Sequence, residues 1–144
     1  MAGLAAPICP HSNEKEARAH EINLAAGLLV EHNFLSPSAL DEISIVFCPL
    51  TYGLGIVPKP NTIYIDDALQ SGSVDTLAEV LLHEFEHVKQ MRAAGSTAFK
   101  CAYITDLLAC GGCMDKNHAM EAPAYAAQAR VRDFLLQRWL KDSR

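Results

Sequence analysis

Two features that would assign this chain to a membrane or secreted class are missing from it. No apolar run approaches the roughly 20 residues that a membrane-spanning helix needs. The first twenty residues lack a positively charged region, and their apolar stretch is too short for a secretory signal. We therefore expect cytoplasmic synthesis, with export by a leaderless route left open.

The chain also lacks an excess of basic residues. It has 17 acidic and 12 basic side chains and a net charge of −5, whereas a nucleic-acid-binding protein normally carries a basic face. Nucleic acid is therefore not an expected partner. Residues 41–86 contain eight acidic side chains and a single basic one, Lys59. Such a region favours a bound cation, although a solvated acidic face is the more common explanation.

No internal repeat, linker or long polar low-complexity segment interrupts the 144 residues, half of which are hydrophobic. That length and composition fit one compact domain with its own core. We expect a single domain over residues 1–144. Its N-terminal helical part covers 1–40, and its sheet, central helix and C-terminal helices cover 41–144.

Apolar periodicity and β-branched runs predict mostly helices with a small sheet, an α+β fold. Ser12 or Asn13 is expected to cap the first helix and Asn33 to end it. Residues 49–61 are dense in Gly and Pro and predict a loop or an irregular sheet edge. The expected helices cover 13–33, 75–94, 96–110 and 119–140, and the expected strands cover 43–48 and 62–66.

A His-Glu-x-x-His pattern stands in the middle of the second of these helices, as His83, Glu84 and His87. Four residues advance a helix by about 400°, so both histidines project from one face and could bind one Zn²⁺. Glu84 would lie beside the metal and take a proton from water. The alternative is an ordinary helix whose histidines are hydrogen-bonded on a half-exposed face. The strongly apolar surroundings favour the metal site, because buried polar groups need partners.

The third ligand must come from elsewhere in the chain. Asp106, Asp115, His118 and Glu121 follow the helix in sequence. Glu121 ranks first because it is a lone carboxylate in a segment of small and apolar residues, "MEAPAYAAQA", that is suited to close packing. Asp106 ranks second and His118 third. An acidic residue that merely caps a helix is the alternative explanation of Glu121.

"LLHEFEHVKQ" followed by "MEAPAYAAQA" resembles the zincin-type metallopeptidase domain associated with extracellular contractile injection systems. The matched part covers about residues 61–130. The resemblance implies His83, His87 and Glu121 as zinc ligands and Glu84 as catalytic base, with Gln90 a structural residue of the zinc helix. It also implies a peptide or protein substrate and a secretion-system or regulatory partner.

Two further features bear on a peptidase mechanism. Tyr125 stands one turn after Glu121 and is the first candidate for a donor that stabilises an oxyanion, with Tyr103 and His118 as alternatives. The expected strand at 62–66 is a candidate edge for pairing with an extended peptide.

Three cysteines, Cys101, Cys110 and Cys113, lie within thirteen residues. The first interpretation is a pair of cysteines buried as small hydrophobic residues at a helix end, with a disulfide second and a second metal site third. Cys9 and Cys48 have no partner that the sequence reveals.

The leading function is thus a zinc metallopeptidase. A zinc-containing binding or toxin-related effector module with little or no peptidase activity is the main alternative. A thiol redox protein centred on Cys110 and Cys113 is the third.

Overall fold

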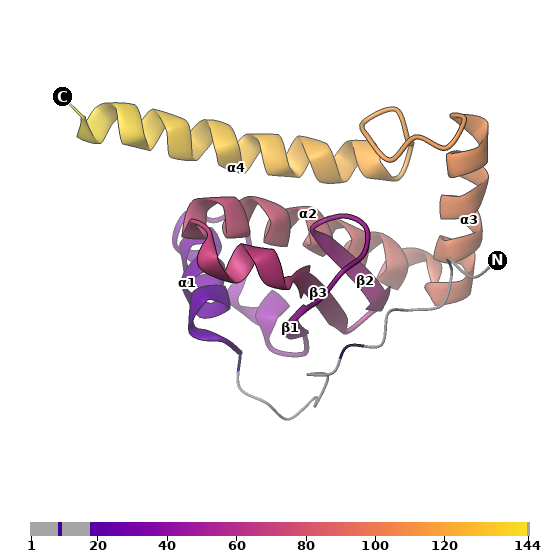
Figure 1. The fold of residues 1–144 in the computed structure, drawn as a ribbon, viewed down its shortest axis with the longest axis horizontal. Coiled ribbons are helices and arrows are strands. Elements are labelled where there is room, and N and C mark those ends of the chain that lie inside the picture. Colours follow the sequence, from indigo (N-terminus) through magenta and orange to yellow (C-terminus); the bar gives the residue numbers. More distant parts are fainter. Residues whose placement is uncertain (1–8, 10–17, 144) are drawn as a thin grey trace.

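A computed structural model describes Cys9 and residues 18–143 of the chain and confirms the α+β class (Figure 1). Four α-helices and a three-stranded sheet account for most of the described residues. The helices are α1 (His20–Glu31), α2 (Val74–Ala94), α3 (Ser96–Ala109) and α4 (Glu121–Asp142). The strands are β1 (Ser44–Cys48), β2 (Gly55–Lys59) and β3 (Thr62–Asp66), and short 3₁₀ helices cover Pro37–Leu40 and Asp67–Ser71.

β3 is the central strand of the sheet, whose order is β1-β3-β2. It pairs in parallel with β1 and antiparallel with β2, and Pro60 and Asn61 form the turn between β2 and β3. Because both sides of β3 are paired, the expectation that this strand offers an edge to a peptide is wrong. The free edges among the described strands belong to β1 and β2.

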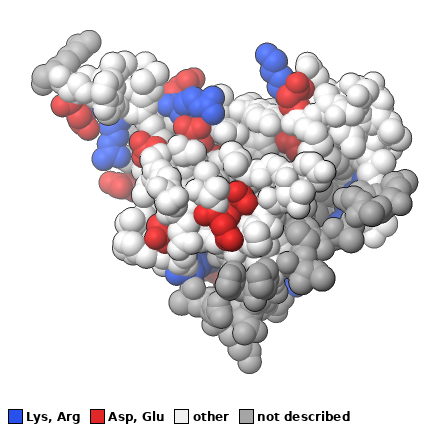
Figure 2. Space-filling view, in the orientation of Figure 1, with Lys and Arg blue, Asp and Glu red and all other residues white. Residues whose placement is uncertain are grey.

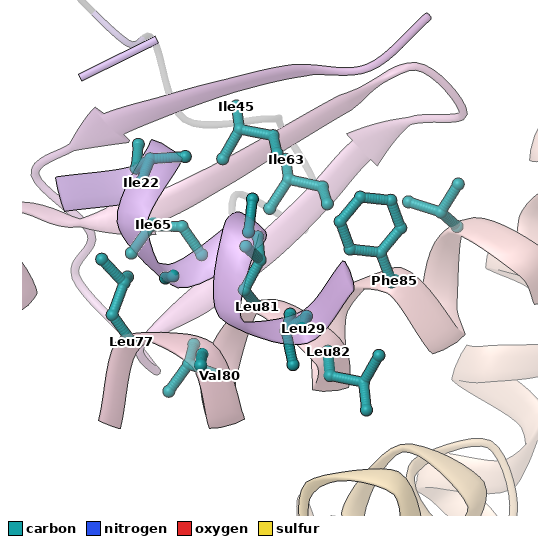
Figure 3. Packing of buried hydrophobic residues seen from close by; sticks show 14 of the residues in the cluster. Ile22, Leu29, Ile45, Ile63, Ile65, Leu77, Val80, Leu81, Leu82 and Phe85 are labelled. Atoms are coloured by element: carbon teal, nitrogen blue, oxygen red, sulfur yellow. The ribbon is translucent and has the colours of Figure 1, made fainter. Parts of the chain in front are cut away.

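α2 lies between the sheet and α4 (Figure 1). α4 runs alongside α2, on the side of α2 that faces away from the strands. The sheet side chains Ile45, Ile63 and Ile65 pack against Leu81 and Phe85 of α2 (Figure 3). α1 completes the same hydrophobic cluster with Ile22, Ala25, Ala26 and Leu29. The N-terminal helix therefore shares its core with the rest of the chain.

α1 is shorter at its start than the sequence predicts. The proposed caps Ser12 and Asn13 lie outside the described residues, and Ala19 is the last residue before the helix, with extended backbone. The side chain of Arg18 donates hydrogen bonds to the carbonyl oxygens of Leu40 and Ile43, which fixes the approach of the chain to α1. Asn33 ends this region as predicted, with a positive φ of 62°.

Charged side chains are scattered over the face of the molecule shown in Figure 2. Blue Lys and Arg side chains alternate there with red Asp and Glu side chains and do not merge into a broad basic surface. Among the described residues, none of the helices combines the length and the apolar character that crossing a membrane requires.

Candidate metal centre

His83, Glu84 and His87 all lie in the buried middle of α2. Ser73 caps this helix by accepting a hydrogen bond from the Thr76 N–H, and the helix ends before Gly95, whose φ is 88°. Glu121 is the first residue of α4, 38 positions after His83, and its carboxylate faces the two rings. The Nε2 atom of His83 lies 2.9 Å from Glu121 Oε2, and that of His87 lies 3.0 Å from Glu121 Oε1.

These three side chains fit a metal ion in number, chemistry and position. They are the one group of His, Cys, Asp and Glu in the described chain whose ligand atoms converge in this way, all within 4.8 Å of one another. Tetrahedral zinc, with bonds of about 2.0–2.2 Å, holds its ligand atoms about 3.3–3.6 Å apart. The ligand atoms of this group therefore lie close enough together to share one ion. Two histidines and a carboxylate can bind a metal here, and its identity is open.

Electrostatic coupling within the group is strong because all its members are buried. Burial alone would raise the pKa of Glu121, but hydrogen bonds from His83, His87 and Tyr103 hold it well below its usual range. Burial alone would lower the pKa of His87, but the hydrogen bond to Glu121 and the charges of Glu84 and Glu121 raise it to about 8. In the absence of a cation, a proton on the His87 ring thus links it to the carboxylate. Metal binding would displace that proton.

Glu84 lies beside the group with 5% of its surface exposed. Burial raises its pKa to about 7, and the nearby His87 and His83 offset part of that rise. β2 passes directly over its carboxylate: a Cβ atom placed on Gly55 would lie 2.7 Å from Glu84 Oε1. Any side chain at this position would force the Glu84 side chain to move, so the edge strand and the carboxylate are in contact.

Two tyrosines border the group in different ways. The Tyr103 hydroxyl, from α3, donates a hydrogen bond of 2.7 Å to Glu121 Oε1. The Tyr125 ring packs edge-on against His83, with centroids 4.6 Å apart, and its hydroxyl donates to the Met114 carbonyl at 3.2 Å. Tyr103 is therefore committed to the carboxylate, whereas Tyr125 is 38% exposed and bound only to a loop carbonyl.

The other acidic and histidine candidates stand apart from this group. Asp106 is on α3, and Asp115 accepts a hydrogen bond from the Asn117 N–H in the α3–α4 loop. His118 is fully buried, but both ring nitrogens have other partners: Nε2 donates to the Tyr103 carbonyl and Nδ1 accepts from the Met120 N–H. His118 thus fastens the loop that leads into α4.

The cysteines correct the first interpretation of them as separate small hydrophobic residues. Cys110 and Cys113 form a disulfide, and Cys101 is exposed and free. Gly111 and Gly112, between the bonded pair, have φ values of 75° and 87°, which only glycine adopts without strain. The disulfide alternative therefore holds for this pair. Cys9 and Cys48 are buried together with Tyr64 on the sheet face away from α2.

Two glutamines contact the histidines, and only one of them had been singled out from the sequence. Gln90 Oε1 lies 2.9 Å from His87 Nδ1, and Gln128 Oε1 lies 2.9 Å from His83 Nδ1. Gln128 follows Glu121 by seven residues, which is two helical turns. That spacing on the predicted last helix was the available signal for it.

Comparisons with family models, with curated proteins and with solved structures give no match to the chain. The resemblance to zincin-type domains therefore depends on the motif residues and on a buried His-His-Glu group that is consistent with such a site.

Proposed function

We propose that the chain is a zinc-dependent metallopeptidase in which His83, His87 and Glu121 bind the ion and Glu84 is the catalytic base. One observation carries the proposal: a buried carboxylate on α4 meets both histidines of the α2 motif, with Glu84 alongside. A zinc ion held there would act as a Lewis acid that lowers the pKa of water and polarises a peptide carbonyl.

Glu84 would take one proton from the attacking water and deliver it to the leaving amine nitrogen as the C–N bond breaks. The protein's own groups raise the pKa of Glu84 to about 7. A neighbouring cation lowers it again, because positive charge favours the carboxylate. Glu84 is then ionised at neutral pH and ready to accept a proton.

Tyr125 is the proposed donor to the developing oxyanion. Its partly exposed hydroxyl can exchange its loop carbonyl partner for a substrate oxygen, whereas the Tyr103 hydroxyl is already bound to Glu121. The substrate backbone would pair with the edge of β2, because Gly55 of that strand touches Glu84.

The alternative function is a metal-containing binding or effector module without peptidase activity. It is favoured by the burial of the group: His83, Glu84, His87 and Glu121 are each at most 8% exposed. A catalytic zinc needs a coordination position that water and substrate can reach, whereas a structural zinc does not.

Metal content by elemental mass spectrometry, followed by digestion of a peptide library, tests both functions. We expect one zinc per chain in the wild type, loss of the metal in His83→Asn and Glu121→Gln, and retention in Asp106→Asn, the matched control on α3. Glu84→Gln should keep the metal and lose hydrolysis.

Each outcome decides between the functions. A wild type that binds no added zinc would overturn both, and metal retained in Glu121→Gln would remove that residue from the ligands. One zinc per chain without any cleavage would favour the alternative, a metal-containing module without peptidase activity.

A further inference from the structure

Each histidine of the metal group has its two ring nitrogens on different partners. In both rings Nε2 faces a carboxylate oxygen of Glu121. Nδ1 faces the side-chain oxygen of a glutamine, at a distance of 2.9 Å in each ring. An amide oxygen has lone pairs and no proton, so it can only accept. Each Nδ1 is therefore the donor in its contact with glutamine, which leaves Nε2 as the ring atom that can bind a metal ion.

The orientation of the Gln90 amide follows from its second partner. Its Nε2 donates a 2.9 Å hydrogen bond to the Met120 carbonyl, so Oε1 is the atom that faces His87. Met120 directly precedes Glu121, so a single side chain connects the second histidine to the segment that carries the carboxylate. The position of His87 on α2 and the start of α4 are thus fixed relative to each other.

Gln128 makes the corresponding contact from the opposite helix. Glu121 and Gln128 lie on one face of α4, which packs closely on α2 through the buried Ala124 and Ala127. α4 therefore supplies both the carboxylate that meets His83 Nε2 and the amide oxygen that meets His83 Nδ1. The ring is held from its two sides by one rigid helix.

A neutral amide suits this place for an electrostatic reason. The group already contains two buried carboxylates, Glu84 and Glu121. A further carboxylate behind either ring would add like charge in a poorly solvated region. Glutamine accepts the Nδ1 proton and orients the ring without that cost.

We propose that Gln90 and Gln128 are positioning residues that hold His87 and His83 with the Nε2 lone pairs directed at the bound metal ion. This inference rests on the proposed metal site and adds the residues that preorganise it. Partners of this kind on metal-ligating histidines typically contribute 10–100-fold to metal affinity.

The test is the dissociation constant of Co²⁺ and Zn²⁺, measured by competition with a chelator, for Gln90→Met and Gln128→Met. Methionine keeps the approximate length of the side chain but does not supply the amide oxygen. We expect each variant to weaken binding by about 10–100-fold and the two losses to multiply in the double variant, since each acts on a different ring. Gln137→Met, at an exposed position of α4, is the matched control and should leave affinity unchanged.

Gln90→Glu and Gln128→Glu separate positioning from general support of the fold. A carboxylate still accepts the Nδ1 proton, and a bound cation offsets the like-charge repulsion that disfavours it in the metal-free protein. Both variants should therefore bind the metal at least as tightly as the wild type. Unchanged affinity in both methionine variants, or an equal loss in the glutamate variants, would overturn the inference and leave the metal site standing. A wild type that binds neither ion would remove the site and the inference together.

Discussion

Replacing Glu84 by glutamine should stabilise the metal-free protein at neutral and alkaline pH, although Glu84 is the proposed catalytic base. The ordinary pKa of 4.5 rises to about 7 at this buried position. One pKa unit corresponds to about 1.4 kcal/mol, so the ionised carboxylate is disfavoured by roughly 3 kcal/mol in the fold. The glutamine variant has the same shape and carries no such penalty.

The pH dependence follows from the sign of the shift. The folded state holds the Glu84 proton more tightly than the unfolded chain does, so this contribution to stability is fully present below pH 4.5. It is lost as the pH rises through about 7. The advantage of Glu84→Gln over the wild type should be small at pH 4.5 and reach about 3 kcal/mol at pH 8.

Urea denaturation of chelator-treated protein at several pH values measures this difference. Because His87 and Glu121 titrate in both proteins, the comparison isolates Glu84 to a first approximation. Glu86→Gln is the matched control, because Glu86 pairs with Lys89 on the same helix. Loss of the Glu86–Lys89 ion pair should lower the free energy of unfolding by at most about 1 kcal/mol. An advantage of Glu84→Gln that is absent, or that shrinks as the pH rises, would refute the reasoning.

Three further changes probe the surroundings of the site. Gly55→Ala places a methyl group 2.7 Å from the Glu84 carboxylate and should reduce peptide hydrolysis at least tenfold in kcat while metal content stays at the wild-type level. Tyr103→Phe removes a hydrogen bond from Glu121 and should weaken Zn²⁺ binding in chelator competition by about tenfold, since a hydrogen bond to a charged group contributes about 1.5 kcal/mol. Cys110→Ser opens a short disulfide loop and should cost about 2 kcal/mol of unfolding free energy in urea.

Each of these changes has a control at a position away from the site. Gly27→Ala on α1 meets nothing within 4 Å and should stabilise that helix by about 0.5–1 kcal/mol. Tyr52 and Cys101 are exposed, so Tyr52→Phe and Cys101→Ser should match the wild type. Equal effects of a site variant and its control would show that the contact in question contributes nothing.

The long helices and the metal-site candidate were accessible from the sequence because their signals are local. α2 has a helical apolar period and a glycine at its end, and its histidines are four residues apart. β2 was harder to recognise, because Pro58 cannot donate a hydrogen bond to a neighbouring strand. As an edge strand it tolerates that residue.

What could not be predicted depends on pairs far apart in the chain. The central place of β3 depends on its pairing with β1. These two strands are separated in the sequence by the whole of β2. Gln128 meets His83 across 45 residues. Its seven-residue spacing from Glu121 places both on one face of α4, but it does not indicate which residue of α2 lies opposite. The state of Cys110 and Cys113 was equally ambiguous, since their spacing suits buried thiols, a disulfide or a metal.

The division of the site between two helices also affects how the chain is held together. α1, α2 and the sheet share one large hydrophobic cluster, to which α4 adds Ala127, Val131 and Leu135. Close to the site, α4 meets α2 through small side chains such as Ala124 and Ala127. An ion bound by His83 and Glu121 would cross-link two points 38 residues apart and close the intervening segment into a ring. Undocking of α4 and release of the ion would then be one event, so the metal affinity would also measure how firmly α4 is attached.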